Sequence, residues 1–227
     1  MHHCVVEIFG QNVNMDTLLT MWLCMAILIV LAFISTRKLS IVPGKAQFLG
    51  EKVMEMFWGL TDSMIQKEGR KHVPLLASLF LFILVANLCG QIPWRIYHLK
   101  GGGEFASPTN DINLTAAMAI LVLVYYVYQG VKVKGYKFFI HDFSFVGIIM
   151  ALIEVLELVV RPFSLALRLF ANILAGELLV VAVLGIVAFV LPVPIMLFEV
   201  FVAFLQALVF LLLSTSYIAI ATQVDEH

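Results

Sequence analysis

One stretch of the chain carries charged side chains at helical spacing among apolar neighbours. Six polar positions share one face if the stretch is a helix: Glu154, Glu157, Arg161, Ser164, Arg168 and Asn172. At about 100° per residue they fall within a stripe roughly 80° wide. A charge inside a membrane span costs about 2.5–3.5 kcal/mol on insertion scales, so this stripe is expected to face water or a close partner.

The last apolar stretch carries a second polar face. By the same count, one side of it is formed by Glu199, Ala203, Gln206, Phe210, Ser214 and Tyr217. Two antiparallel helices with facing polar stripes could line an ion path. The alternative is that these side chains only hold helices together, as polar residues in membranes often do. Two costly carboxylates and an arginine favour the ion path.

The two arginines of the first stripe are not equivalent. Arg168 falls near the middle of the long apolar stretch, and so near the middle of the membrane. Arg161 lies two turns nearer one end, where it can extend toward water or pair with Glu157 at i, i+4. If one arginine has an electrostatic function, Arg168 is the candidate.

Composition indicates a membrane protein that is not itself an enzyme. Of the 227 residues, 62% are hydrophobic and 13% charged, whereas about a quarter of a soluble domain is charged. No HExxH, GxSxG or Walker motif occurs, so we expect no covalent chemistry and no cofactor. His2, His3 and Cys4 could bind a metal, but a disordered N-terminal tail is the favoured interpretation.

The elements that must position these residues are helices. We predict an all-α integral membrane protein of one domain (1–227), with five crossings and one interfacial amphipathic helix. The last two helices are long and tilted, because their apolar stretches exceed one membrane thickness. The predicted parts are an external tail (1–16), a first crossing (17–36), an amphipathic helix on the cytoplasmic side (43–71), a second crossing (73–94), an external loop (95–112), a third crossing (112–131), a cytoplasmic loop (132–142), a long tilted helix (143–191) and a last helix (193–224).

The basic residues predict the orientation. Only Arg95 and Lys100 fall on one side of this topology. The other side holds Arg37, Lys38, Lys45, Lys52, Lys67, Arg70, Lys71, Lys132, Lys134 and Lys137. The positive-inside rule then places the N-terminus outside and the C-terminus in the cytoplasm.

Several motifs resemble those of subunit a of F-type ATP synthases. Residues 161–177, RPFSLALRLFANILAGE, are similar to that family's signature around an essential arginine, and 205–210, LQALVF, to its second motif around a glutamine. Residues 87–93, NLCGQIP, and 108–113, PTNDIN, also resemble family loops. The resemblance extends from about Pro74 to the C-terminus.

The resemblance implies a role for each matching residue. Arg168 would be the stator arginine that faces a carboxylate of the rotor. The outer half-channel would be lined by Asn172, Glu177, Glu199 and Gln206. Glu154 would belong to the cytoplasmic half-channel. At Glu199 many bacterial relatives carry a histidine instead.

The resemblance also implies partners and a location. The expected function is proton or sodium-ion translocation against an oligomeric c-type rotor ring, with peripheral-stalk b-type subunits completing the complex and no nucleic acid. No organelle transit peptide is evident, so a bacterial plasma membrane is expected. Two alternatives remain open. A secondary transporter would show inverted repeats, and none is found. A structural membrane anchor would leave the charged stripe unexplained.

Overall fold

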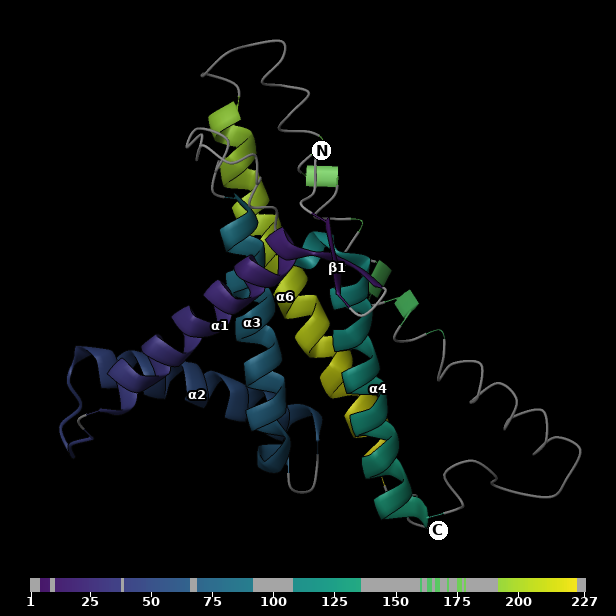
Figure 1. The fold of residues 1–227 in the computed structure, drawn as a ribbon. Coiled ribbons are helices and arrows are strands. Elements are labelled where there is room, and N and C mark those ends of the chain that lie inside the picture. Colours follow the sequence, from purple (N-terminus) through teal and green to yellow (C-terminus); the bar gives the residue numbers. More distant parts are fainter. Residues whose placement is uncertain are drawn as a thin grey trace, which may run out of the picture.

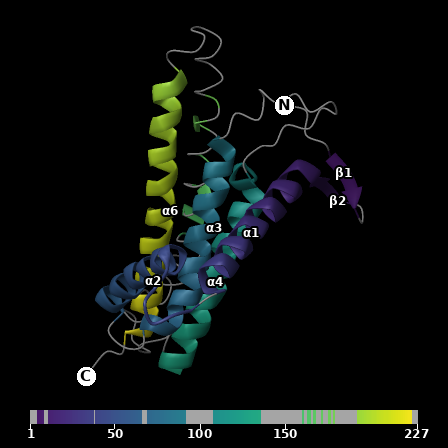
Figure 2. The same ribbon diagram turned by 90° about the vertical axis from the view of Figure 1, so that its left-hand side faces the viewer.

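A computed structural model describes residues 5–8, 11–37, 39–65, 69–91, 108–135 and 192–223, together with positions 160, 163–164, 166–167, 171, 175–176 and 178. Most of the predicted long helix, 143–191, lies outside the described residues, although each position described between 160 and 178 is helical. Three helices, α3 (Val73–Gln91), α4 (Ile112–Lys134) and α6 (Pro192–Thr222), run alongside one another, as both ribbon views show (Figures 1 and 2).

Local signals explain where these helices begin and end. Asp111 caps α4, because its side chain accepts a hydrogen bond from the Asn113 amide at 2.9 Å. Gly135 ends the same helix with a φ of 64°, a left-handed conformation that glycine adopts without strain. The prolines of α6, Pro192 and Pro194, fall in its first turn, where their missing N–H groups have no intrahelical partner to lose.

Two further helices lie beside the three. α1 (Met15–Thr36) crosses them obliquely, and α2 (Lys45–Met64) lies across one end of the group (Figure 2). Phe57 of α2 packs edge-on against Phe80 of α3, with ring centroids 5.5 Å apart. The predicted range 43–71 for the amphipathic helix is too long. The helix observed there, α2, ends at Met64, and a separate 3₁₀ turn, η1 (Gly69–His72), leads into α3.

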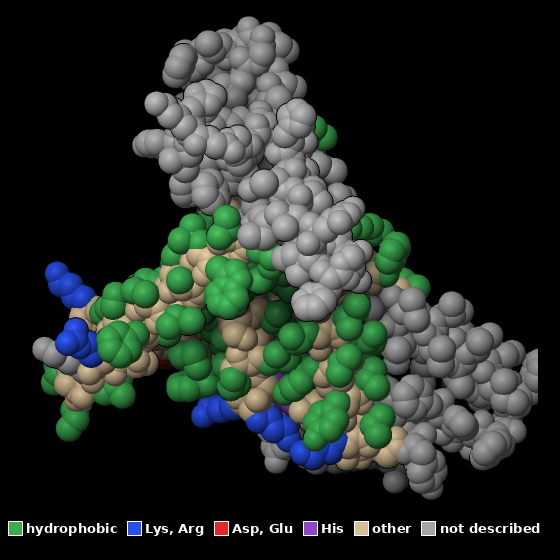
Figure 3. All heavy atoms as spheres, in the orientation of Figure 1, with side chains coloured by type: hydrophobic (Ala, Val, Ile, Leu, Met, Phe, Trp, Pro, Cys, Tyr) green, Lys and Arg blue, Asp and Glu red, His purple; other side chains and the backbone are tan. Residues whose placement is uncertain are grey.

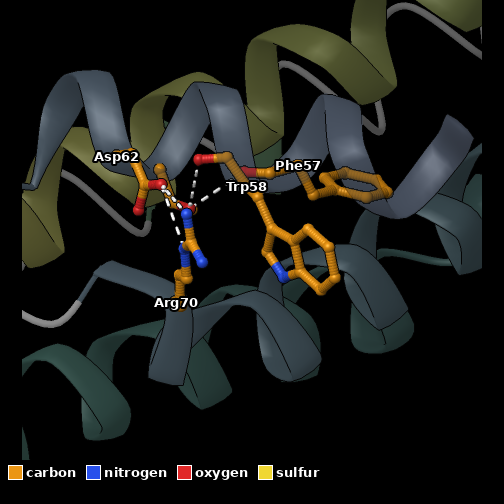
Figure 4. A network of polar contacts seen from close by, with 5 residues as sticks. Phe57, Trp58, Asp62 and Arg70 are labelled. Carbon is orange, nitrogen blue, oxygen red and sulfur yellow. Dashed lines mark hydrogen bonds and ion pairs between the residues drawn. The ribbon is translucent and has the colours of Figure 1, made fainter. Parts of the chain in front are cut away.

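An ion pair joins the end of α2 to η1. Arg70 donates from Nε and Nη2 to Oδ2 of Asp62, at 3.1 and 3.0 Å. The same guanidinium lies over the Trp58 ring, 5.7 Å from its centroid (Figure 4). These side chains are largely exposed, so they fix the geometry of the turn more than they add stability.

The N-terminal segment departs from an all-helical chain. Strands β1 (Val5–Ile8) and β2 (Gln11–Asn14) pair antiparallel, with Ile8 opposite Gln11. The predicted tail of residues 1–16 therefore contains a hairpin, and α1 begins within it at Met15. A second short turn, η3 (Pro108–Asn110), precedes α4.

Four of the described helices are long and apolar enough to cross a membrane: Thr17–Thr36, Gly69–Gly90, Ile112–Lys134 and Leu197–Thr222. The remaining predicted crossing, 143–191, falls mostly on residues outside the description. The core lies where α2, α3, α4 and α6 meet, and its largest fully buried side chains include Phe57, Leu76, Ile83, Phe210 and Leu211. The architecture is that of a helical membrane protein.

Candidate functional site

The predicted polar face of α6 points into the protein. Glu199 and Gln206 are each 8% exposed, and Ser214 and Thr215 are fully buried. The opposite face is apolar and exposed, with Leu197, Phe198, Phe201, Phe204 and Leu212 on it. Because polar side chains are costly in lipid, this division is the one expected if the inner face meets protein or water.

Glu199 packs against a glycine of the signature segment. A Cβ atom built on Gly176 would lie 3.1 Å from Oε1 of Glu199, 3.4 Å from its Cδ and 3.7 Å from its Cγ. Glycine therefore lets the carboxyl group rest almost directly on the backbone of the other helical segment. This contact brings the polar face of α6 to the stretch that contains the arginine motif.

A buried amide holds α6 at the level of Gln206. Asn87 of α3 donates from Nδ2 to the carbonyl of Ala203 at 3.5 Å, and its Oδ1 accepts from the Thr109 hydroxyl at 2.7 Å. Asn87 and Thr109 are both fully buried. Three elements, α3, η3 and α6, are thereby joined one turn before Gln206. The residue types gave no indication of this link, although both residues lie in loop motifs that resemble the family.

A second buried polar pair lies at the other end of α3. His72 Nδ1 is 2.9 Å from the Tyr125 hydroxyl of α4, and their rings meet edge to face. His72 is fully buried. The sequence prediction missed this residue; a lone histidine between a basic cluster and an apolar run was the available signal.

The structure places two of the six predicted site residues. Glu199 and Gln206 lie on the same buried face of α6, as predicted. The other four, Glu154, Arg168, Asn172 and Glu177, lie outside the described residues. Among the side chains that the structure describes, no three of His, Cys, Asp and Glu gather as a metal site would require.

Comparison with known proteins identifies the family. The family model described as ATP synthase A chain matches residues 18–219. The chain is 41% identical to the ATP synthase subunit a of Gloeobacter violaceus over 226 residues, which is 99% of this chain and 90% of that protein. The chain belongs to the ATP synthase A chain family.

Membership of the ATP synthase A chain family confirms the resemblance of the motifs and extends it. The match begins at residue 18, within α1, so it also covers the segment before Pro74, for which no resemblance was recognised. Together with the four apolar helices, it makes the chain a multi-pass membrane protein. Both residues of the Glu199–Gly176 contact fall inside the matched region.

Proposed function

We propose that this chain carries protons or sodium ions between two offset half-channels and the rotor ring of an F-type ATP synthase. Its family supports a place in the membrane sector of that complex. The observation that carries the proposal is the packing of Glu199 against Gly176, because it brings the polar face of α6 against the segment that contains the arginine motif. The chain itself would make and break no covalent bond.

In this mechanism Arg168 acts through its charge. A rotor carboxylate facing lipid is neutral, because desolvation disfavours its anion; a nearby cation favours the anion. As the carboxylate reaches Arg168 it releases its ion into one half-channel, and it reloads from the other after the ring has turned. An arginine stays protonated at any relevant pH, so it also blocks direct proton leakage between the half-channels.

The outer half-channel would use the buried face of α6. Glu199 and Gln206 lie on that face, seven residues and about 10 Å apart along the helix axis. Asn172 and Glu177 would complete the outer half-channel from the other helix. Glu154 would line the cytoplasmic half-channel. The burial of Glu199 and Gln206 supports this assignment, because buried polar groups need water, ions or polar partners.

We further propose that Glu177 and Glu199 share one proton. Glu199 rests on Gly176, the residue immediately before Glu177. Around an ideal helix, residue 177 would lie about 180° from Arg168 but about 100° from Gly176. Because Glu199 lies against Gly176, its carboxyl is closer to the direction of Glu177 than it would be if it faced Arg168. Two carboxylates in a poorly solvated site do not both ionise. A pair of carboxyls that holds one proton could pass protons along the outer half-channel toward the rotor.

The charge distribution supports the proposed orientation. Figure 3 shows the described Lys and Arg side chains in the lower half of the view, where α2, η1 and the end of α4 lie. By the positive-inside rule this end would face the cytoplasm, with the N-terminus outside and five crossings in total. α2 would then lie in the cytoplasmic interface. The proposed setting is a bacterial plasma membrane, with c-type and b-type subunits as partners.

Arg168→Ala is the direct test of the function. We expect it to abolish ATP-driven ion pumping while the complex still assembles, because the role of the side chain is electrostatic. Arg168→Lys should fail as well, since a lone ammonium near mid-membrane can lose its proton. Arg161→Ala is the matched control and should be much milder. Pumping would be followed in membrane vesicles by ATP-driven ion uptake, and normal uptake by Arg168→Ala would end the proposal.

The shared proton has a separate test. Glu199→Gln should lower pumping several-fold and shift its pH dependence, because the remaining carboxyl then titrates alone. Glu199→His should restore part of the activity, since an imidazole can again exchange a proton with Glu177. Rate and pH profile would be measured in the same vesicles. If both variants pump at the rate of the unaltered protein and with the same pH dependence, the shared proton is contradicted. The proposed role of Arg168 would not be affected.

A further inference from the structure

A cavity of about 310 Å³ lies between the end of α1 and the start of α2. Its lining includes Phe33 and Ile34 of α1, Arg37 just after that helix, and Lys45 at the start of α2. The two helices converge at this end of the molecule (Figure 1). None of these residues belongs to the proposed ion path, so the cavity calls for its own explanation.

The walls of this cavity are held together by local bonds. The Ser35 hydroxyl donates to the carbonyl of Ala46 at 3.1 Å, which ties the end of α1 to the first turn of α2. Buried Gln47 accepts from the Ser40 amide at 3.1 Å and donates to the Ser40 carbonyl at 3.0 Å. A Cβ atom on Gly50 would overlap Ser35 Oγ, so glycine permits the close approach of the helices. The cavity is therefore preformed by the fold.

The lining combines two cations with an apolar wall. Arg37 and Lys45 are exposed, the lining contains no carboxylate, and neither cation forms an ion pair with any of the side chains that the structure describes. Glu51, the first carboxylate of α2, accepts a hydrogen bond from Gln47 instead and lies outside the lining. Phe33 and Ile34 are 62% and 53% exposed. An anion with an apolar part would satisfy both halves of the cavity.

The position along the helix narrows the class of ligand. The apolar span of α1 ends at Thr36, so Arg37 follows directly where the hydrocarbon layer should end. Phosphate groups of lipids lie at that level, with acyl chains on the apolar side. A guanidinium matches a phosphate in a bidentate manner. A zwitterionic lipid would bring its own cation toward Arg37 and Lys45, which disfavours it.

We propose that this cavity binds an anionic glycerophospholipid. Arg37 and Lys45 contact its phosphate, and Phe33 and Ile34 contact the first part of an acyl chain. The bound lipid fills the junction of α1 and α2. This inference needs only that the chain spans a membrane, so it stands or falls independently of ion translocation.

Photo-crosslinking of the unaltered protein tests the site. The purified complex that contains the chain is placed in nanodiscs with a photoactivatable phosphatidylglycerol or the matching phosphatidylcholine, and labelled peptides are mapped by mass spectrometry. We expect labelling within residues 33–47 by phosphatidylglycerol and much less by phosphatidylcholine. Equal labelling by both lipids, or none in this segment, would overturn the proposal. Loss of labelling in excess inorganic phosphate would assign the cavity to a soluble anion and also overturn it.

Two sets of variants test the residues. The double variant Arg37→Gln, Lys45→Gln should reduce the preference for phosphatidylglycerol roughly tenfold, because each basic group near an anionic lipid contributes about a fivefold factor before screening. Lys52→Gln is the control: this cation lies on the same helix outside the cavity, paired with Glu55 at 2.7 Å. If Lys52→Gln reduces the preference for phosphatidylglycerol as much as the double variant does, the preference comes from the charge of the whole surface, and the proposed site is wrong. If the double variant does not assemble, Arg37→Lys replaces it and should retain the preference for phosphatidylglycerol. The crosslinking of the unaltered protein then still tests the lipid site.

Discussion

α1 and α3 are apolar helices of similar length that are used differently. In the most apolar part of the Thr17–Thr36 span of α1, 11% of residues are buried, against 44% in the most apolar part of Gly69–Gly90, most of which is α3. α3 buries large apolar side chains such as Ile83, and it also presents small or polar ones to its neighbours, among them Ala77, Ala86 and Asn87. α1 instead exposes large side chains such as Trp22 and Ile29.

The difference shows what apolar character alone can achieve. It is enough to place a helix in a membrane, but lipid is as apolar as leucine, so it does not drive one helix onto another. Small residues permit close backbone approach, and buried polar groups fix the register. The two described residues of the proposed ion path, Glu199 and Gln206, lie on α6, which packs against α3, and α1 lies beside α3.

The close packing of Glu199 against Gly176 should make this position sensitive to the size of its side chain. Gly176→Leu would drive a side chain into the Glu199 carboxyl group, and we expect pumping to fall more than tenfold. Gly176→Ala should be far milder, because a methyl group at 3.1 Å requires Glu199 to yield by only a few tenths of an ångström. Ion uptake by vesicles measures both.

Ala175→Leu provides the matched control for this position. Ala175 is the exposed neighbour of Gly176 on the same segment, whereas Gly176 is partly buried and lies against Glu199. Ala175 lies on the Arg168 face by the helical count, so equal losses in Ala175→Leu and Gly176→Leu would mean that added bulk near that face is enough to impair pumping. The contact with Glu199 would then not be the cause.

The second test compares the replacement of one isoleucine in α3 with the replacement of one isoleucine in α1. Ile83 of α3 is fully buried and Ile29 of α1 is 67% exposed. Ile83→Ala should cost roughly 2–3 kcal/mol, near the low end of the range for cavity-forming substitutions, because lipid removes part of the transfer term. Ile29→Ala should cost much less. Thermal dissociation of the complex in nanodiscs compares them, and a larger loss for Ile29→Ala would mean that a partner subunit covers α1.

Much of this packing could be anticipated from the sequence, and part could not. The apolar stretches predicted α1, α3, α4 and α6 because a membrane-length run without charge has few other uses. The end of α2 at Met64 comes before a turn in which Arg70 contacts Asp62, and sequence spacing does not reveal that contact. The hairpin did leave a signal, since Gly10 lies between two short extended runs.

The candidate site divides in the same way. Glu199 and Gln206 were predictable because a polar side chain in an apolar helix is costly and needs a reason. Asn87 is also a polar residue in an apolar helix, but the sequence did not indicate its partner, because its contact with Ala203 joins residues 116 positions apart. Pairing between distant helices depends on tertiary packing, and one helical pattern carries no information about it.

The smallest expected effect concerns the hydrogen bond between Thr109 and Asn87. Thr109→Val keeps the shape of the side chain but removes the hydroxyl that donates to Asn87 Oδ1 at 2.7 Å. We expect a loss of about 1 kcal/mol, the net value of one buried hydrogen bond. Thr109→Ser keeps the hydroxyl and serves as the control. Because Asn87 also donates to the Ala203 carbonyl, loosening it should shift α6 near Gln206 and lower pumping by more than the change in stability explains. Equal pumping by the valine and serine variants, after correction for the amount of assembled complex, would mean that the bond stabilises the fold without positioning the ion path.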